Sequence, residues 1–442
     1  MLTACGSRSG TAAVPTLPEA ESLDRPAFNP GAFIKHVVII VQENRSFDNL
    51  FNGFPGANTA QSGQNSEGQT IALTQVSLAA PYDLLHTHPA FETEYAGGLL
   101  NGFNLDPIKC NKDAPPRECP AAALAAYAYV SESDVQPYWD MASSYTIADN
   151  MFETNQGPSF PAHQYLVSGT STISNGSTLR AAENPLEANG TTQTGGCDSP
   201  AGSTVLLIDQ YGNESQTMFP CFDRISLMER ADAAGVSWRY YQTGPHAGLW
   251  HAPDALRGIR YSGWYSDVVP SPAQVLTDIA HRQLASIVWV TPTRESSDHP
   301  GMNNGTGPSW VASIVNAIGK SKYWSSTAIF VVWDDWGGWY DHVPPTIFNS
   351  YELGFRVPLL VISPYAKASY VSNVQHEFGS ILKFTEETFN LPSLGTTDVR
   401  ADDLSDCFNF KGPMHRFNHI RTKYPAQYFL HRPPSDLPPD DD

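Results

Sequence analysis

The sequence predicts an α/β protein, a three-layer α/β/α sandwich around a mostly parallel central sheet. Short apolar runs rich in Val and Ile, typical of buried strands, recur along the chain. Segments of helical character lie between them. Such alternation is typical of parallel sheets with helices on both faces. The strand runs are residues 34–41, 145–152, 236–242, 284–290, 328–333 and 356–363, and the helical segments are 121–129, 134–144, 223–234, 272–282, 310–319 and 377–389.

Composition limits the kinds of partner. Only 16% of the 442 residues are charged, and 33 glycines with 35 prolines predict long ordered loops. A net charge of −19 argues against a nucleic acid or an anionic membrane surface as the main partner. We expect one large domain over residues 33–425, with loop insertions around 52–84, 105–120 and 171–222, the last of them a surface excursion.

The two chain ends have their own composition. Residues 1–32 are expected to be an export tether or linker, and residues 426–442 a Pro/Asp-rich tail. The segment around Cys5 resembles a bacterial lipobox, in which Cys5 would carry a lipid anchor. The hydrophobic segment expected before a lipobox is missing from the sequence, so either the chain start is misassigned or truncated or the match is due to chance.

The remaining cysteines suggest an oxidising compartment. Cys110 with Cys119 and Cys197 with Cys221 are two nearby pairs in loop-like sequence, and we predict a disulfide in each. Cys407 is left over, and no Cys/His spacing typical of a zinc site occurs. We therefore expect a secreted, periplasmic or cell-surface protein.

Polar side chains follow the first predicted strand. Glu43 and Asn44 come just after residues 34–41, where open α/β sheets place their ligand sites. A carboxylate beside a carboxamide offers two oxygen ligands to a divalent cation. Alternatively, Asn44 caps the next helix and Glu43 is a solvated turn residue.

The strongest predicted strand, residues 328–333, is followed at once by Asp334 and Asp335. Two adjacent aspartates at the end of a buried strand repel each other and lose hydration, and a cation relieves both effects. The alternative is a solvated turn, but the flanking sequence is apolar and rich in Trp. The pattern favours a metal site.

Ser159 follows a predicted strand and a Gly-Pro turn, and Pro161 fits the first turn of a helix. A hydroxyl at a helix N-terminus is a plausible nucleophile, because free N–H groups and the dipole stabilise negative charge there. The alternative is that Ser159 is only the helix N-cap. This segment alone leaves both readings open.

The sequence contains, in this order, the blocks ENRSFDN, GPSFP, SDHPG, WDDWGGWYDHVPP and GFRVPLLVISPYAK. Together these blocks resemble the bacterial phosphoesterase family, which includes secreted acid phosphatases and non-haemolytic phospholipases C. The resemblance covers about residues 34–410. It implies an alkaline-phosphatase-like fold, one bound metal ion and a covalent phosphoenzyme.

The resemblance also implies roles for individual residues. Ser159 would be the nucleophile and would also contact the metal, and His86 and His299 would be site histidines. The metal ligands would be Glu43, Asn44, Asp334 and Asp335. Their oxygen atoms favour Ca²⁺, Mg²⁺ or Mn²⁺, with zinc as an alternative. Three more histidines, His163, His246 and His342, are expected near the site as hydrogen-bonded residues rather than ligands.

Departures from the family pattern affect the expected activity. Phospholipase C members usually have Thr where Ser159 stands, so Ser159 favours a phosphatase, and Ala162 replaces a carboxamide found in related sequences. We expect a metal-dependent phosphomonoesterase of the acid phosphatase type, acting on small phosphorylated substrates. One alternative is a phospholipase C that binds phospholipid headgroups, and a remote one is a lipoprotein that binds phosphorylated ligands without turnover.

Overall fold

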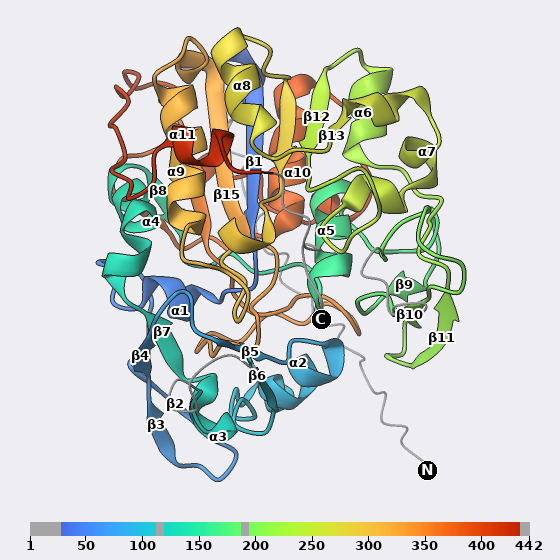
Figure 1. The fold of residues 1–442 in the computed structure, drawn as a ribbon, viewed down its shortest axis with the longest axis vertical. Helices are drawn as coiled ribbons and strands as arrows, with labels where there is room; N and C mark the ends of the chain where they lie inside the picture. The colour runs from blue at the N-terminus through green and yellow to red at the C-terminus, as the bar shows by residue number, and fades with distance from the viewer. Residues whose placement is uncertain (1–27, 112–118, 187–193, 434–442) are drawn as a thin grey trace, which may run out of the picture.

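An eight-stranded, mostly parallel sheet forms the centre of the computed structural model, which describes residues 28–111, 119–186 and 194–433 (Figure 1). Five adjacent strands run parallel, and β16 runs antiparallel to both of its neighbours. The order across the sheet is β13 (Val268–Val269), β12 (Trp238–Tyr241), β14 (Ile287–Val290), β1 (His36–Gln42), β15 (Thr327–Trp333), β16 (Leu359–Ile362), β8 (Thr146–Ala148) and β17 (Tyr370–Ser372). The predicted α/β class is confirmed.

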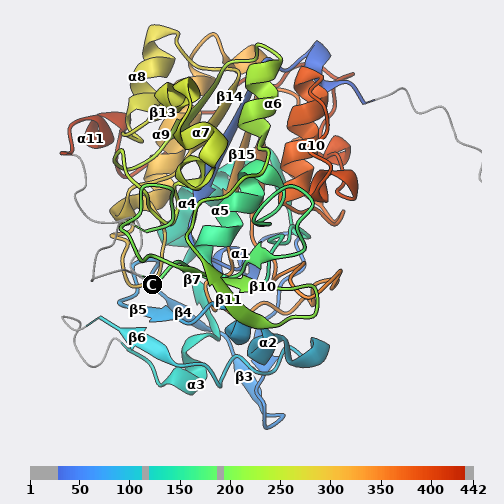
Figure 2. The same cartoon turned by 90° about the vertical axis from the view of Figure 1, so that its right-hand side faces the viewer.

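Helices cover both faces of this sheet (Figure 2). One face carries α4 (Glu132–Ser144), α8 (Gln274–His281), α9 (Gly307–Gly319) and α11 (Ala426–Leu430), and the other carries α5 (Ser159–Ser168), α6 (Leu227–Ala233) and α10 (Phe378–Phe389). Every residue of β15 is buried between these layers. Its sequence TAIFVVW contains no charged side chain, which is typical of a strand covered on both faces.

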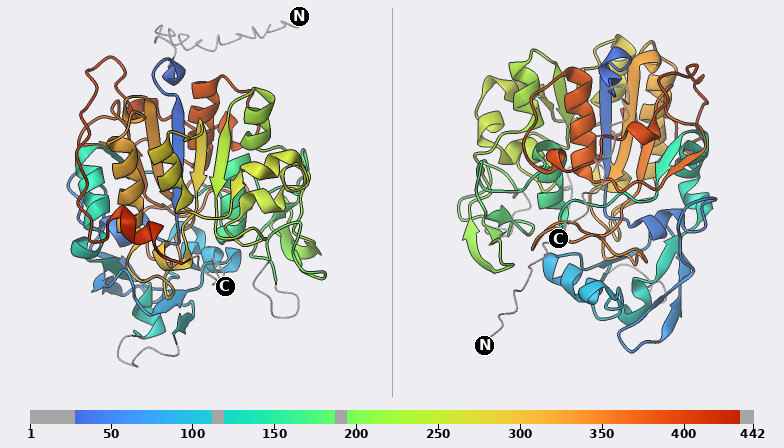
Figure 3. Two further views of the ribbon diagram at one scale, coloured as in Figure 1. Left: turned by 45° about the horizontal axis from the view of Figure 1, so that its top comes forward. Right: turned by 180° about the vertical axis from the view of Figure 1, so that it is seen from behind.

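A smaller region lies beyond the carboxyl ends of β1 and β15, at the bottom of Figure 1. It contains α1 (Phe47–Phe51), α2 (His88–Tyr95), α3 (Ala122–Ala125), β2 (Ser62–Gln64), β3 (Thr70–Ala72), β4 (Thr74–Val76), β5 (Tyr82–Leu84), β6 (Ile108–Cys110) and β7 (Ala128–Val130). A second apolar cluster, which includes Trp336 and Trp339, packs within it. The view from behind in Figure 3 shows the same region below the sheet.

One predicted helix is wrong in part. Residues 121–129 were expected to be helical throughout, but α3 ends at Ala125 and the chain continues into β7. β7 pairs in parallel with β4, from Thr74 opposite Ala128 to Val76 opposite Val130. Local helix propensity is a weak preference, and pairing with a strand distant in sequence overrides it here.

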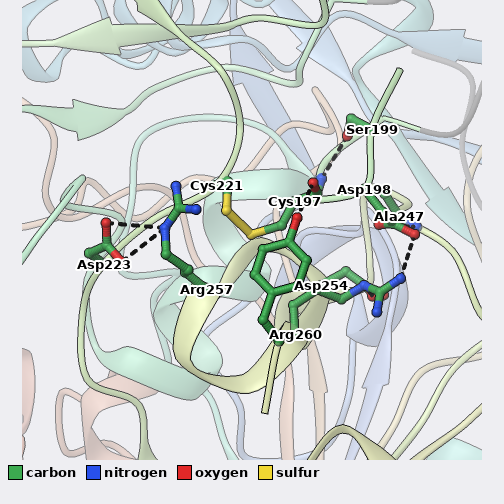
Figure 4. Close-up of a disulfide and its surroundings, with 11 residues drawn as sticks. Cys197, Asp198, Ser199, Cys221, Asp223, Ala247, Asp254, Arg257 and Arg260 are labelled. Atoms are coloured by element: carbon green, nitrogen blue, oxygen red, sulfur yellow. Dashed lines mark hydrogen bonds and ion pairs between the residues drawn. A yellow bond between two sulfur atoms is a disulfide. The ribbon is translucent and has the colours of Figure 1, made fainter. Parts of the chain in front are cut away.

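The segment 171–222 contains a small sheet of β9 (Arg180–Ala181), β10 (Val205–Ile208) and β11 (Glu214–Met218). Both predicted disulfides, Cys110–Cys119 and Cys197–Cys221, are formed. Figure 4 shows Cys197–Cys221 beside two ion pairs of α7 (Arg257–Arg260), Arg260 with Asp198 inside the segment and Arg257 with Asp223 just after it. Cys407 is a buried free thiol. The expected lipid-anchor residue, Cys5, lies outside the described residues.

Among the described residues, no helix has both the length and the apolar character that crossing a membrane requires.

Candidate functional site

Four of the predicted site residues follow two adjacent strands in register. Gln42, the last residue of β1, lies opposite Trp333, the last residue of β15. Glu43 and Asn44 therefore continue one strand where Asp334 and Asp335 continue the other, and all four side chains are buried. Beyond the strand ends the backbone turns, with Asn44 in a left-handed conformation, and the four side chains form two groups.

The first pair, Glu43 and Asp334, meets His163 from helix α5. His163 Nε2 lies 3.1 Å from Glu43 Oε1 and 3.6 Å from Asp334 Oδ2. All three side chains are buried, and their potential ligand atoms lie within 4.8 Å of one another. The sequence led us to expect His163 as a neighbouring hydrogen-bonded residue. Its position makes it a candidate ligand as well.

The second pair, Asn44 and Asp335, meets Ser159 at the start of the same helix. Ser159 Oγ donates a hydrogen bond to Asp335 Oδ2 over 3.2 Å. Asn44 Nδ2 lies 3.1 Å from Asp335 Oδ2 and 3.3 Å from Ser159 Oγ. The predicted nucleophile therefore contacts two of the predicted metal ligands.

The helix-cap readings of Asn44 and Ser159 do not hold. Helix α1 is capped by Ser46, whose side chain accepts a hydrogen bond from the Asn49 amide. Helix α5 has Pro158 at its N-cap position, so Ser159 is the first helical residue and makes no cap bond. Both side chains are thereby left available for the site.

His86 and His299 flank this second group. His86 Nε2 lies 3.0 Å from Asn44 Nδ2, and His86 Nδ1 lies 2.8 Å from the Leu84 carbonyl. His299 Nδ1 lies 2.9 Å from the Pro300 carbonyl, and the two imidazole rings are 6.0 Å apart. A carbonyl can only accept, so each Nδ1 carries a proton, and Nε2 is the nitrogen of each ring that can gain or release one.

The structure places His246 and His342 away from Ser159. His246 has a side chain that is 58% exposed and pairs with Asp198. His342 lies 2.5 Å from Asp48, next to the ion pair of Asp341 with the buried Arg356. The Arg356 guanidinium bonds to Asp341 and lies 3.4 Å from Asp48, so this second acidic group already has a cation of its own.

Buried negative charge dominates the site. Burial raises the pKa of Asp335 well above its usual range, and the neighbouring Asp334 raises it further. Glu153 is also fully buried, and burial together with Asp335 and Asp334 raises its pKa strongly. The sequence around Glu153 gave no signal for this position. Ser159 and His163, by contrast, are four residues apart on one helix, and that spacing could have paired them.

The residues present fit a hard divalent cation. Asn44 Oδ1 and Asp334 Oδ2 are buried oxygens that have no hydrogen-bond partner among the described residues. Three carboxylates, a carboxamide and a hydroxyl converge here, and all five side chains are buried. Buried polar oxygens are normally satisfied, and a cation would satisfy these and offset the charge.

The chain is similar in sequence to several bacterial phospholipases C. A non-hemolytic phospholipase C from Pseudomonas aeruginosa is 25% identical over 93% of this chain and 63% of its own. Phospholipase C B from Mycobacterium tuberculosis (H37Rv) is 25% identical over 86% of this chain and 78% of its own. The chain spans less than two thirds of the length of the Pseudomonas relatives.

A solved structure described as a protein in the alkaline phosphatase superfamily from Vibrio parahaemolyticus is 10% identical, with a TM-score of 0.36 over 84% of this chain and 72% of that one. The sequence model of the Phosphoesterase family matches residues 34–392. The match covers most of the chain, including all the residues gathered around Ser159, and confirms the resemblance seen in the motifs. On that ground, the protein belongs to the phosphoesterase family.

Proposed function

We propose that this protein hydrolyses phosphoric esters through a covalent phosphoserine on Ser159. The observation that carries the proposal is the contact of Ser159 Oγ with Asp335 and Asn44, next to two histidines that present Nε2. Membership of the phosphoesterase family supports the same reaction class.

Glu43, Asn44, Asp334 and Asp335, with Ser159 and His163 beside them, would hold a divalent metal ion. When bound, such an ion supplies Lewis-acid stabilisation of charge on the phosphoryl oxygens. The oxygen-rich set favours Ca²⁺, Mg²⁺ or Mn²⁺, and His163 adds a nitrogen that also suits zinc.

The chain's own residues account for the proton transfers. Ser159 Oγ attacks phosphorus while its proton leaves towards Asp335 Oδ2, and the ester P–O bond breaks. His86 or His299, protonated on Nε2, donates a proton to the departing alcohol oxygen. Water then hydrolyses the phosphoserine, releasing phosphate and restoring the hydroxyl.

The helix N-terminus contributes less than the sequence led us to expect. The Phe160 amide donates a hydrogen bond to Asn184 Oδ1 over 3.0 Å, and Pro161 has no N–H. Few free amides of the first turn of α5 are thus left for a phosphoryl group. The two site histidines therefore have the larger part in holding its oxygens.

Two activities within this class remain separable by experiment. Ser159 favours a phosphomonoesterase, whereas the relatives named phospholipase C favour cleavage of phospholipid diesters. We rank the phosphomonoesterase first. Two disulfides support an exported protein, because they persist in oxidising compartments.

Ser159→Ala tests the nucleophile. Both 4-nitrophenyl phosphate and phosphatidylcholine are assayed. For the compound that the native protein hydrolyses, we expect the rate of hydrolysis to fall about a thousandfold or more. Ser168→Ala is the matched control, because Ser168 is buried on the same helix and its hydroxyl has no hydrogen-bond partner in the described residues. Retained turnover in Ser159→Ala would refute the assignment, and phosphate binding without turnover in the native protein would favour a binding protein.

A further inference from the structure

A cavity of about 710 Å³ opens beside the Ser159 site. His86, which contacts Asn44, and Pro158, which precedes Ser159, form part of its wall. A cavity of this size is typical of sites for small organic ligands. Because His86 lines the cavity and also contacts the site residue Asn44, the cavity adjoins the place where a phosphoryl group would meet Ser159.

Most of the cavity wall is aliphatic, and it comes from separate parts of the chain. Leu85 and Ile108 belong to the region beyond the strand ends, and Leu249 follows β12. Leu186 and Leu206 belong to the segment 171–222, which was expected to be only a surface excursion. Leu186 is 67% exposed and Leu85 is 39% exposed, so these apolar side chains are accessible to a ligand.

The charged groups in the wall already have partners or are neutral. Asp83 of β5 lies opposite Lys109 of β6 in the strand register. Glu214 bonds to Nδ1 of His88, and Glu183 accepts a hydrogen bond from the His88 amide over 2.9 Å. Burial, with Glu214 nearby, raises the pKa of Glu183 to about 8, so Glu183 is mostly protonated at neutral pH. Among the described residues of the wall, each of these carboxyl groups thus has a neighbouring group of the protein to interact with or is mostly protonated.

We propose that this cavity binds the organic group of the phosphoric ester and selects an uncharged aliphatic group. The proposal rests on the proposed phosphoesterase function. Burial of aliphatic carbon against the leucine wall favours longer alkyl groups, whereas a charged group would lose its hydration without gaining a partner.

Two series of soluble esters test the selectivity. One is the alkyl phosphates from ethyl to octyl, read by phosphate release, and the other is the matching alkyl phosphocholines, read by phosphocholine release. The alcohols differ little in reactivity, so chain length reports binding. We expect kcat/KM in the hydrolysed series to rise up to about fourfold per added methylene until the cavity is filled. We expect 5-carboxypentyl phosphate to be at least tenfold poorer than hexyl phosphate.

Variants tie the effect to this wall. Leu186→Asn should leave kcat/KM for the ethyl ester unchanged. Near the octyl end of the series, the factor by which kcat/KM rises with each added methylene should be at least twofold smaller than in the native protein. Leu124→Asn is the matched control, because Leu124 is 50% exposed and lies outside the cavity.

The outcomes separate the two proposals. Hydrolysis that does not depend on chain length, or a carboxylated ester accepted as well as the alkyl one, overturns the selectivity while leaving the phosphoesterase function intact. The same holds if Leu186→Asn and Leu124→Asn behave alike. A wild-type protein that hydrolyses neither series refutes the proposed function itself.

Discussion

Asn44 holds a left-handed backbone conformation, with φ of 58°, at the point where β1 turns into the site. Its carbonyl oxygen packs against Gly337, where an added Cβ would lie 2.3 Å away. Glycine is therefore required at position 337, because two backbone segments approach closely there and because Gly337 has a positive φ. At this position the backbone, as much as the side chain, sets the geometry of the site.

His163 is the residue whose role the structure changed most. We expect His163→Ala to weaken divalent metal binding at least about tenfold, because its imidazole either binds the ion or orients Glu43 and Asp334. Metal content after dialysis against graded chelator concentrations measures this without reference to activity. His246→Ala is the control, since that histidine is exposed. Equal metal retention in both variants would contradict the assignment.

Glu183 gives a pH-dependent contribution to stability. Its pKa is raised to about 8 in the folded protein, from a usual value near 4.5. Between these pH values the folded state binds more protons than the unfolded state, so stability falls as pH rises through this window. A shift of one pKa unit corresponds to about 1.4 kcal/mol in the free energy of unfolding. After a reduction for partial solvent exposure, the loss of stability across this window should be about 2 kcal/mol.

Urea unfolding of the native protein and of Glu183→Gln at pH 5 and pH 8 measures this contribution. Relative to the native protein, the variant should gain stability at pH 8, because Gln has no ionised form. An identical pH dependence in the two proteins would show that Glu183 ionises normally.

At the scale of elements, the ion-pair network around Arg356 joins α1 to the segments that follow β15 and precede β16. The buried Arg356 guanidinium bonds to both oxygens of Asp341, lies 3.4 Å from Asp48, and donates to the Asp149 carbonyl. This network connects three of the sequence blocks that carry the family resemblance, so these blocks have a structural role at the Arg356 network.

Arg356→Met should lower the free energy of unfolding by about 3 to 5 kcal/mol, because it leaves buried carboxylates without a counterion. Arg257→Met is the matched control. Its pair with Asp223 is more than half exposed on both sides, so its loss should cost less than about 1 kcal/mol. Urea unfolding of both variants makes the comparison, and similar losses would argue against the network.

The elements that could be predicted are those whose pattern is local. The strands β1, β14 and β15 are continuous apolar runs, and the polar residues that follow them mark the site. The end of α3 could not be predicted, because β7 forms only through pairing with β4. The cavity wall was missed for the same reason. Leu186 and Leu206 stand in a polar, Gly-rich segment, and only the packing of that segment beside His86 gives them a role.

At the scale of the whole molecule, the chain carries a formal net charge of −19, although its candidate site is proposed to bind anions. Repulsion of a dianionic ester should weaken as salt screens this charge. We expect kcat/KM for a dianionic monoester to rise about two- to fivefold between roughly 10 mM and 150 mM salt. A zwitterionic phosphocholine ester is the control and should change little. A fall with salt for the monoester would indicate a locally positive approach to the site.

The register of β1 and β15 constrains the number of residues as well as their identity. Glu43 and Asp334 contact His163, whereas Asn44 and Asp335 contact Ser159, just beyond the point where Gln42 lies opposite Trp333. Inserting or deleting one residue near either strand end would shift one strand end relative to the other and separate these residues from their partners. Apolar exchanges within these strands can be absorbed by repacking, whereas a change of length by one residue cannot. For engineering of this protein, the strand ends are therefore the places where loops should not be shortened or lengthened.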